Sequence, residues 1–209
     1  MIIQGQVGQP TISTLSAGTT PPVRQGQLGD VIVSELHGRY YETAYRRNMY
    51  TATLTAGTTT SAALSTTFTG LLLLNPNNSQ VNIVVNKVGF SFLVAFTAAA
   101  AIGLQTGNQS TALLSGLTTT NTSVRPNYVG AGIGTGLTYS AATTTGPVLQ
   151  QLFGAGLTGA ITTTPQVFSY FDLEGSLILP PGAWVGSYTS TASGSSGMFM
   201  TIQYEEIPL

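Results

Sequence analysis

The stretch SLILPPGAWVGSY, from Ser176 to Tyr188, decides the fold class. Its two apolar halves carry β-branched and aromatic residues, and Pro180-Pro181-Gly182 between them is a tight-turn signal. Upstream, Gln166–Leu173 alternates polar residues with apolar and aromatic ones, and Met198–Tyr204 follows downstream after a Ser/Gly loop. The C-terminal part of the chain therefore predicts strand, turn, strand, loop and strand, arranged as an antiparallel β-meander.

Further strands are predicted in the N-terminal half. The segments rich in β-branched, aromatic or other apolar residues are Val31–Val33, Arg39–Tyr45, Met49–Leu54, Leu71–Leu74 and Val81–Phe96. Weaker strand candidates lie near Val124–Val129 and Val148–Phe153, and a run of alanines favours a short helix over Thr97–Leu104. Many short strands with Gly, Pro and Asn between them predict an all-β protein, built as an antiparallel β-sandwich or jelly roll.

The chain divides into an arm and one large domain. Residues 1–29 are rich in Gly, Gln, Pro, Ser and Thr, and their scattered apolar residues follow neither a helical nor a strand period. We therefore expect an extended N-terminal arm that becomes ordered only on a partner. Residues 30–209 form the predicted sandwich domain, with a Gly- and Thr-rich insertion around 105–165 that is typical of variable outer surfaces.

Charge is scarce in this chain. Only 6% of the 209 residues are charged and the formal net charge is −1, whereas typical soluble domains are about 25% charged. Short uncharged side chains take the place of charges, and they cause little repulsion between packed copies. Without a basic excess we expect no nucleic-acid partner. The longest apolar stretch, Phe92–Leu104, is shorter than the ~20 residues of a spanning helix, so we expect no membrane partner either.

Residue sets for catalysis are also scarce. Cysteine is absent and His37 is the only histidine. A serine or threonine nucleophile therefore has at most one histidine to activate it, and a typical zinc site has too few ligands. Asp172 and Glu174 lie two positions apart and could serve glycoside hydrolysis or bind calcium, but a solvated turn is the simpler interpretation. Gly130–Gly136 is glycine-rich, yet its spacing fails the dinucleotide fingerprint. We expect no enzymatic activity and no cofactor, and we assign no catalytic or metal-ligating residue.

Three patches of this sequence resemble structural proteins of tailed bacteriophages. They are Leu36–Glu42 leading to Arg46-Arg47-Asn48, Leu74–Ile83 followed by Lys87-Val88-Gly89-Phe90, and Leu177–Gly182 with Trp184 and the ending Glu205-Glu206-Ile207-Pro208. The last patch is similar to jelly-roll cement, decoration or fibre-head modules. The resemblance covers about half of the chain. It implies a jelly roll, a homotrimer and a place in the virion, with assembly in the host cytoplasm.

Charged and aromatic residues gather in one part of the chain. Of its thirteen charged residues, seven lie between Arg24 and Arg47, interleaved with tyrosines. Arginine and tyrosine dominate interface hot spots because each combines a large contact area with directed hydrogen bonds. This composition predicts a protein-docking surface, although solvated faces of two ordinary strands remain the alternative. The predicted interface residues are Arg24, Glu35, His37, Arg39, Tyr40, Tyr41, Glu42, Tyr45, Arg46 and Arg47.

Two functions fit these observations. The first is a non-enzymatic cement or decoration protein that binds and stabilises a phage capsid, with the major capsid protein and other virion proteins as partners. The alternative is a receptor- or glycan-binding spike or fibre-head module. Its glycan would be held by aromatic residues such as Tyr128, Tyr139, Trp184 or Tyr188. Copy number in the virion separates the two hypotheses, because decoration requires many copies and a spike only a few.

Overall fold

The computed structural model describes residues 5–7, 23–25, 38–96, 98–108, 121–156, 169–194 and 197–209. Within these residues the chain is almost entirely β-structure, and α1 (Tyr41–Tyr45) is a helix of five residues. The predicted all-β class is therefore confirmed. The described part of the chain contains no helix with the length and apolar character needed to cross a bilayer.

The chain separates into two compact units, Met1–Tyr41 and Glu42–Leu209. In the first unit, β1 (Gly5–Val7) and β2 (Val23–Gln25) pair in parallel. Both strands belong to the predicted arm, residues 1–29. The predicted strand at residues 31–33 lies outside the described residues.

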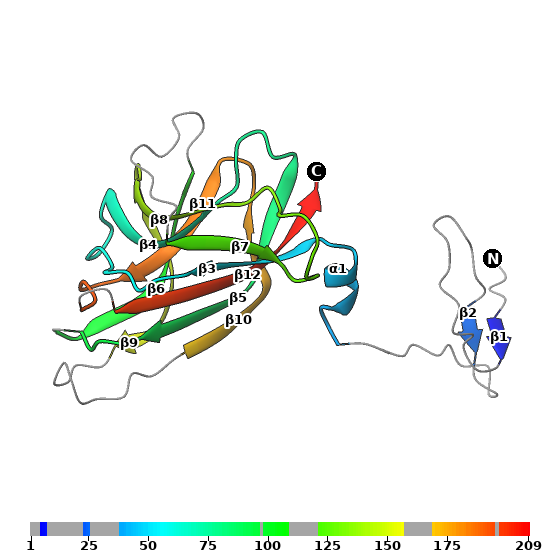
Figure 1. Ribbon diagram of the computed structural model, residues 1–209, viewed down its shortest axis with the longest axis horizontal. Helices are drawn as coiled ribbons and strands as arrows, with labels where there is room; N and C mark the ends of the chain where they lie inside the picture. The colour runs from blue at the N-terminus through cyan, green and yellow to red at the C-terminus, as the bar shows by residue number, and fades with distance from the viewer. Residues whose placement is uncertain are drawn as a thin grey trace. The chain divides into compact units, whose positions relative to one another are not determined.

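The second unit contains two five-stranded sheets (Figure 1). In spatial order, the first sheet consists of β10 (Ser169–Leu179), β5 (Val81–Phe92), β12 (Met198–Pro208), β3 (Met49–Leu54) and β7 (Thr122–Pro126). The second consists of β8 (Leu137–Thr143), β4 (Thr67–Leu74), β11 (Ala183–Thr189), β6 (Ala100–Asn108) and β9 (Val148–Gly156). Neighbouring strands in both sheets are antiparallel, which confirms the predicted β-sandwich.

The strand order is that of a jelly roll, as predicted. Strands β3 to β6 alternate between the two sheets, and strands β9 to β12 alternate in the same way. On its return the chain places β12 between β3 and β5, and β11 between β4 and β6. The remaining strands, β7 and β8, each extend one sheet at its edge, and both come from the predicted insertion around 105–165.

The C-terminal strands form, but the meander predicted for them is wrong. β10 pairs with β5, β11 pairs with β4 and β6, and β12 pairs with β3 and β5. The turn at Pro180-Pro181-Gly182, closed by a 3.0 Å hydrogen bond from the Ala183 amide to the Pro180 carbonyl, leads the chain from one sheet into the other. A turn reverses the chain, but distant strands decide which sheet the next strand joins.

The helix predicted over Thr97–Leu104 is also wrong. Ala100–Asn108 forms β6, which pairs with β11 on one side and β9 on the other. Ala100 and Leu104 are buried in the core. An isolated helix of this length is marginal in water, whereas a strand between two neighbours satisfies its backbone groups and buries its apolar side chains. Tertiary pairing therefore overrides the helix propensity of the alanines.

A strand was expected at Arg39–Tyr45, and the structure has α1 there instead. The helical turn is closed by local hydrogen bonds, from the Tyr41 amide to the Gly38 carbonyl at 2.9 Å and from the Arg47 amide to the Ala44 carbonyl at 3.0 Å. The strand that follows, β3, already has β12 and β7 as neighbours. The β-branched and aromatic residues of this segment therefore do not extend the sheet.

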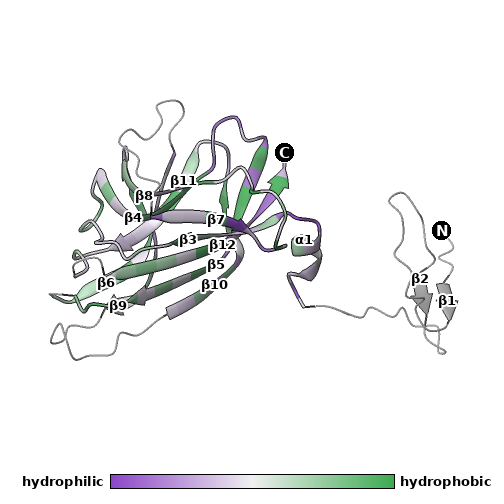
Figure 2. Cartoon of the chain, viewed as in Figure 1, coloured by the Kyte–Doolittle hydropathy of each residue, from purple (hydrophilic) through white to green (hydrophobic). Residues whose placement is uncertain are grey.

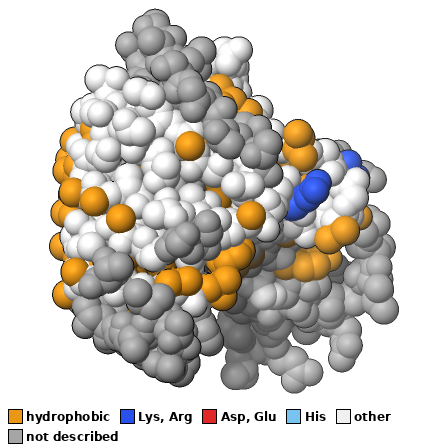
Figure 3. All heavy atoms as spheres, turned by 60° about the vertical axis from the view of Figure 1, so that its left-hand side comes forward, with side chains coloured by type: hydrophobic (Ala, Val, Ile, Leu, Met, Phe, Trp, Pro, Cys, Tyr) orange, Lys and Arg blue, Asp and Glu red, His pale blue; other side chains and the backbone are white. Residues whose placement is uncertain are grey.

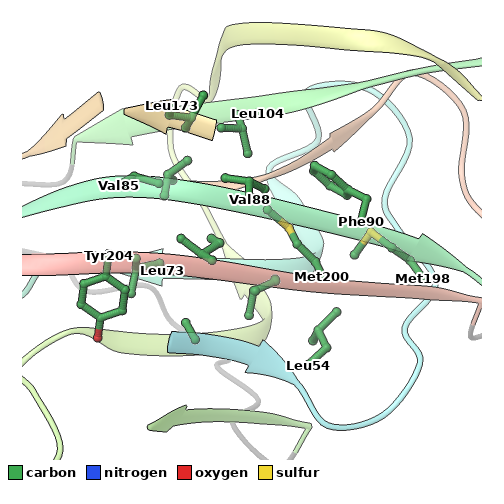
Figure 4. Close-up of a cluster of buried hydrophobic side chains, with 14 of the residues drawn as sticks. Leu54, Leu73, Val85, Val88, Phe90, Leu104, Leu173, Met198, Met200 and Tyr204 are labelled. Atoms are coloured by element: carbon green, nitrogen blue, oxygen red, sulfur yellow. The ribbon is translucent and has the colours of Figure 1, made fainter. Parts of the chain in front are cut away.

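Apolar side chains from both sheets fill the space between them (Figure 4). Figure 2 shows that apolar residues are distributed along the strands of both sheets. A second buried cluster consists of Phe68, Leu72, Leu74, Tyr139, Ala142 and Trp184. Because successive side chains of a strand point to opposite faces, Leu71 and Leu73 enter the main core while Leu72 and Leu74 enter the second cluster. Burial on both faces explains the uninterrupted apolar run in β4.

The pairing of β6 with β9 depends on a glycine. A Cβ atom at Gly103 would collide with the backbone carbonyl of Gln151, whereas one at Gly154, in the same strand pair, would meet nothing. We predict that Gly103→Ala lowers the free energy of unfolding by about 1–3 kcal/mol, as overpacking does. Gly154→Ala should leave it nearly unchanged. Urea denaturation of both variants tests this, and equal stabilities would contradict the register described here.

Candidate protein-docking surface

An exposed patch of aromatic, basic and apolar side chains lies where the chain enters β3 and leaves β7. Its members are Tyr45, Arg46, Arg47, Tyr128 and Val129, and we call it the Tyr45–Tyr128 patch. The exposed fractions of Tyr45, Tyr128 and Val129 are 54%, 42% and 91%. Figure 3 shows a face of the molecule on which basic side chains lie beside hydrophobic ones. Large exposed aromatic residues next to arginines are typical of protein-binding sites.

The rings and the guanidinium group of the patch contact one another. The ring centroids of Tyr45 and Tyr128 are 6.3 Å apart in an edge-to-face arrangement. The Arg47 guanidinium carbon lies 5.4 Å from the centroid of the Tyr128 ring, within the range of a cation–π interaction. Residues distant in sequence are thus joined into one surface. Each side chain restricts its neighbours, which reduces the entropy lost when a partner binds.

The backbone next to Tyr128 is tied to β3. The Asn127 amide donates to the Met49 carbonyl at 2.8 Å. The Thr51 hydroxyl donates to the Asn127 side-chain oxygen at 2.7 Å. Because β3 lies inside the first sheet, these bonds place Tyr128 on a rigid support.

Arg47 occupies a strained backbone position at the end of α1. Its φ is 64°, in the left-handed region that costs a residue with a Cβ roughly 1–2 kcal/mol. Glycine is the usual residue at such a helix end. The Arg47 carbonyl accepts a 2.7 Å hydrogen bond from the Tyr50 hydroxyl, which helps to hold this conformation. Ala63, Gln80 and Glu174 share this left-handed conformation.

A buried carboxylate anchors the loop that carries the patch. Glu206, on β12, accepts hydrogen bonds at Oε1 from the amides of Thr135 at 2.8 Å and Gly136 at 2.9 Å. A Cβ at Gly134 would collide with this same oxygen. The glycine-rich stretch 130–136 therefore does bind an anion, namely the chain's own carboxylate. This contact fixes the loop that begins at Tyr128 against the central strand of the sheet.

Two tyrosines lie close to this carboxylate. Their rings, Tyr50 and Tyr204, stack with centroids 5.7 Å apart. Burial, and secondarily the charge of Glu206, raises the pKa of Tyr204 far above the ordinary tyrosine value, and the same causes raise the pKa of Tyr50. The Tyr204 hydroxyl is buried and has no hydrogen-bond partner among the described residues. Both tyrosines therefore stay neutral at physiological pH.

The structure brings together only part of the interface predicted from the sequence. Tyr45, Arg46 and Arg47 belong to the patch, whereas Arg39, Tyr40 and Tyr41 belong to the unit Met1–Tyr41. In that unit the Arg39 guanidinium carbon lies 5.4 Å from the centroid of the Tyr40 ring. The predicted residues whose side chains fall outside the described part of the chain are Arg24, Glu35, His37 and Glu42.

Sequence reasoning missed Val129 and Glu206, and it considered Tyr128 only as a glycan contact. These residues lie far along the chain from Tyr45, and no local pattern links them. The glycine-rich run beside Tyr128 was the one available signal, because backbone amides free of side chains often surround an anion. Only the pairing of β3 with β7 and β12 reveals which residues meet.

The structure also places the other candidate residues. Asp172 accepts the Glu174 amide at 3.0 Å and forms a 3.7 Å ion pair with Lys87. The described residues contain no cluster of three or more potential metal ligands. Among the aromatic residues considered for a glycan, Trp184 is 0% exposed and Tyr139 is buried. Neither can present a ring to a ligand.

Comparisons with known proteins identify no relative, since no family model, no curated protein and no solved structure matches this chain. Its function must therefore be argued from its own surfaces, because a jelly roll by itself supports many functions.

The Glu206 contact predicts a large effect on stability. Glu206→Ala leaves the buried Gly136 amide and the part-buried Thr135 amide without an acceptor, which should lower the free energy of unfolding by about 2–4 kcal/mol. Glu206→Gln keeps an acceptor and should cost less. The matched control is Glu205→Ala on the outer face of the same strand, which should change stability by no more than ~0.5 kcal/mol. Urea denaturation measures all three, and equal losses for Glu205→Ala and Glu206→Ala would refute the anchoring role.

The raised pKa of Tyr204 predicts instability at alkaline pH. The folded chain holds the tyrosine proton more tightly than the unfolded chain does. Stability is therefore at its full value below the unfolded pKa of about 10 and falls as pH rises above it. Tyr204→Phe removes a hydroxyl that has no partner among the described residues, so it should be nearly neutral at pH 7 and should reduce the alkaline loss. Urea midpoints measured across this range test the prediction, and identical pH profiles for the two proteins would contradict it.

Proposed function

We propose that this protein is a non-enzymatic structural component of a bacteriophage virion, which binds the capsid surface and stabilises it as a cement or decoration protein. The observation that carries the proposal is the Tyr45–Tyr128 patch, a preformed surface of aromatic and arginine side chains on a rigid sandwich. The resemblance of three sequence patches to phage structural proteins supplies the virion context.

The patch supports protein binding more than binding of a small ligand. Tyrosine and arginine are the residue types that dominate the binding energy of protein interfaces. Mutual contacts hold Tyr45, Tyr128 and Arg47 in place. Val129 adds an exposed apolar side chain beside them. A partner that covers this surface would bury apolar area and exclude water from the arginine. Binding to a large, repeated surface such as a capsid fits these properties.

The chemistry of the rest of the chain agrees with a structural role. Cysteine is absent and there is one histidine, so the sequence offers few groups for nucleophilic or acid–base catalysis. Polar side chains pair with one another in place of ions. The hydroxyls of Thr53 and Thr201 lie 3.0 Å apart, and those of Thr60 and Thr189 lie 2.7 Å apart. These pairs are buried or half-buried, so they join strands within the sandwich without placing ions there.

The proposed assembly is a homotrimer that is located in the virion. Its partners are the major capsid protein and other virion proteins. A closed cyclic assembly would cover exposed sheet edges, and β7, β8, β9 and β10 are edge strands of this sandwich. The N-terminal residues 1–29 would add contacts with a neighbouring subunit or with the capsid.

Replacing Arg46 and Arg47 together with alanine tests the patch. If both side chains were merely solvated, binding would change little, because exposed ion pairs are worth only ~0–1 kcal/mol. If both side chains are buried against a partner, their removal should weaken the free energy of binding by on the order of 2–5 kcal/mol. This is more than a tenfold loss of affinity. Alanine and arginine have similar costs at the left-handed position, so the fold should persist.

The double variant should therefore keep its circular dichroism spectrum but fail to cosediment with capsids or to form a trimer of three 21.6 kDa chains in light scattering. Arg125→Ala, which removes an exposed basic side chain outside the patch, is the control for charge. Ala63→Gly, which relieves a φ of 53° elsewhere, is the control for backbone strain. Binding by the double variant within twofold of the wild type would exclude the patch as the docking surface.

A further inference from the structure

A trough runs across the outer face of the first sheet, at the edge opposite β7. Its floor is Gly89 on β5, which lies between its strand partners Tyr170 on β10 and Thr201 on β12. Because Gly89 has no side chain, the sheet is hollowed between its neighbours. The trough has a volume of about 290 Å³. Ligand pockets span roughly 300–1,000 Å³, so this one suits a single small ring.

Aromatic side chains form the walls of the trough. Tyr170 is 60% exposed, which is unusual for an aromatic residue in a strand of a folded domain. Its ring edge would lie 3.2 Å from a Cβ at Gly89, so the ring rests against the glycine backbone. Phe199, which pairs with Ser91, lines the trough from β12. Two aromatic walls over a bare backbone leave space that an apolar face of a ligand can fill.

Lys87 and Asp172 hold the aromatic wall in position. The Lys87 ammonium nitrogen lies 5.5 Å from the centroid of the Tyr170 ring. The same nitrogen forms a 3.7 Å ion pair with Asp172, the strand partner of Lys87. The ring is therefore restrained while still exposed. Since the two charges neutralise each other, this end of the trough matches a neutral ligand and gives no net attraction to a phosphate or a carboxylate.

A few polar side chains border the mostly apolar trough. Ser91 and Ser169 are among the residues that line the trough. The Lys87–Asp172 ion pair lies beside Tyr170. A ligand that fits must combine an apolar face with a rim of hydroxyl groups. Pyranose rings have this combination, because their axial C–H groups form an apolar face and their equatorial hydroxyls point outward.

We propose that the trough is a binding site for one neutral pyranose ring of a glycan. The C–H face of the sugar stacks on Tyr170, above Gly89, and the sugar hydroxyls bond to Ser91 and the Lys87–Asp172 pair. The site lies on β10 and β5, whereas the Tyr45–Tyr128 patch adjoins β3 and β7 at the other edge of the same sheet. Sugar binding therefore goes beyond the proposed docking function and does not depend on it.

Saturation-transfer NMR on the full chain tests this site directly. The probes are the methyl glycosides of glucose, galactose, mannose and N-acetylglucosamine, each at millimolar concentration. Binding of at least one glycoside is expected, with saturation strongest at the ring C–H protons that face Tyr170. Tyr170→Ala should weaken binding roughly tenfold, while Tyr170→Phe keeps the ring and should retain most of it. Gly89→Val fills the trough and should abolish binding.

Tyr128→Ala is the control, because it removes an exposed aromatic side chain at the other edge of the sheet. Circular dichroism and thermal melting establish that each variant is folded. Because Tyr170 is exposed, its replacement has the smallest risk of unfolding the chain. No saturation transfer to any of these glycosides overturns the proposal. Binding that survives Tyr170→Ala, or that is lost with Tyr128→Ala instead, also overturns it by placing the sugar elsewhere.

Discussion

The central strand β12 is the constraint on which the rest of the structure depends. It pairs with β5 along its whole length and with β3 on its other side. Its residues alternate between buried and half-buried from Met198 to Glu206. The inward series Met198, Met200, Ile202 and Tyr204 belongs to the main core. If β12 left the sheet, both the first sheet and the packing between sheets would be lost.

The same alternation positions both candidate sites. The next inward residue after Tyr204 is Glu206, whose carboxylate reaches the loop that carries Tyr128. On the outward face, Phe199 and Thr201 line the trough beside Gly89. One strand thus supports a surface suited to protein at one edge of the sheet and a trough suited to a sugar ring toward the other edge. The trough lies on paired strands, and the loop that carries Tyr128 is hydrogen-bonded to β3 and β12, so neither site has to be ordered when a partner arrives.

Scarcity of charge gives the few ionisable groups unusual weight. Glu206 is buried and accepts hydrogen bonds from backbone amides. Lys87 and Asp172 form an ion pair beside Tyr170. Arg47 lies over the Tyr128 ring although its backbone is strained. Elsewhere in the described residues, hydrogen bonds of hydroxyl groups join segments that ion pairs often join in other proteins. The Ser193 amide donates to the Thr60 hydroxyl, and the Thr60 amide donates to the Ser193 hydroxyl, both at 2.9 Å. Such contacts need no desolvation of charge.

The sequence by itself determined the fold class, most strands and the residue types of the candidate docking surface. Period-two patterns and turn residues are local, so β10, β11 and β12 could be predicted from Gln166–Tyr204 alone, and the arginine–tyrosine cluster was visible as composition. Tertiary structure decided which strands pair, that Ala100–Asn108 is a strand, and that Tyr128 and Glu206 join Arg47. It also decided that Gly89 lies between Tyr170 and Thr201. The physical reason is that strand partners in a jelly roll come from opposite ends of the chain, and no local pattern records which ones meet.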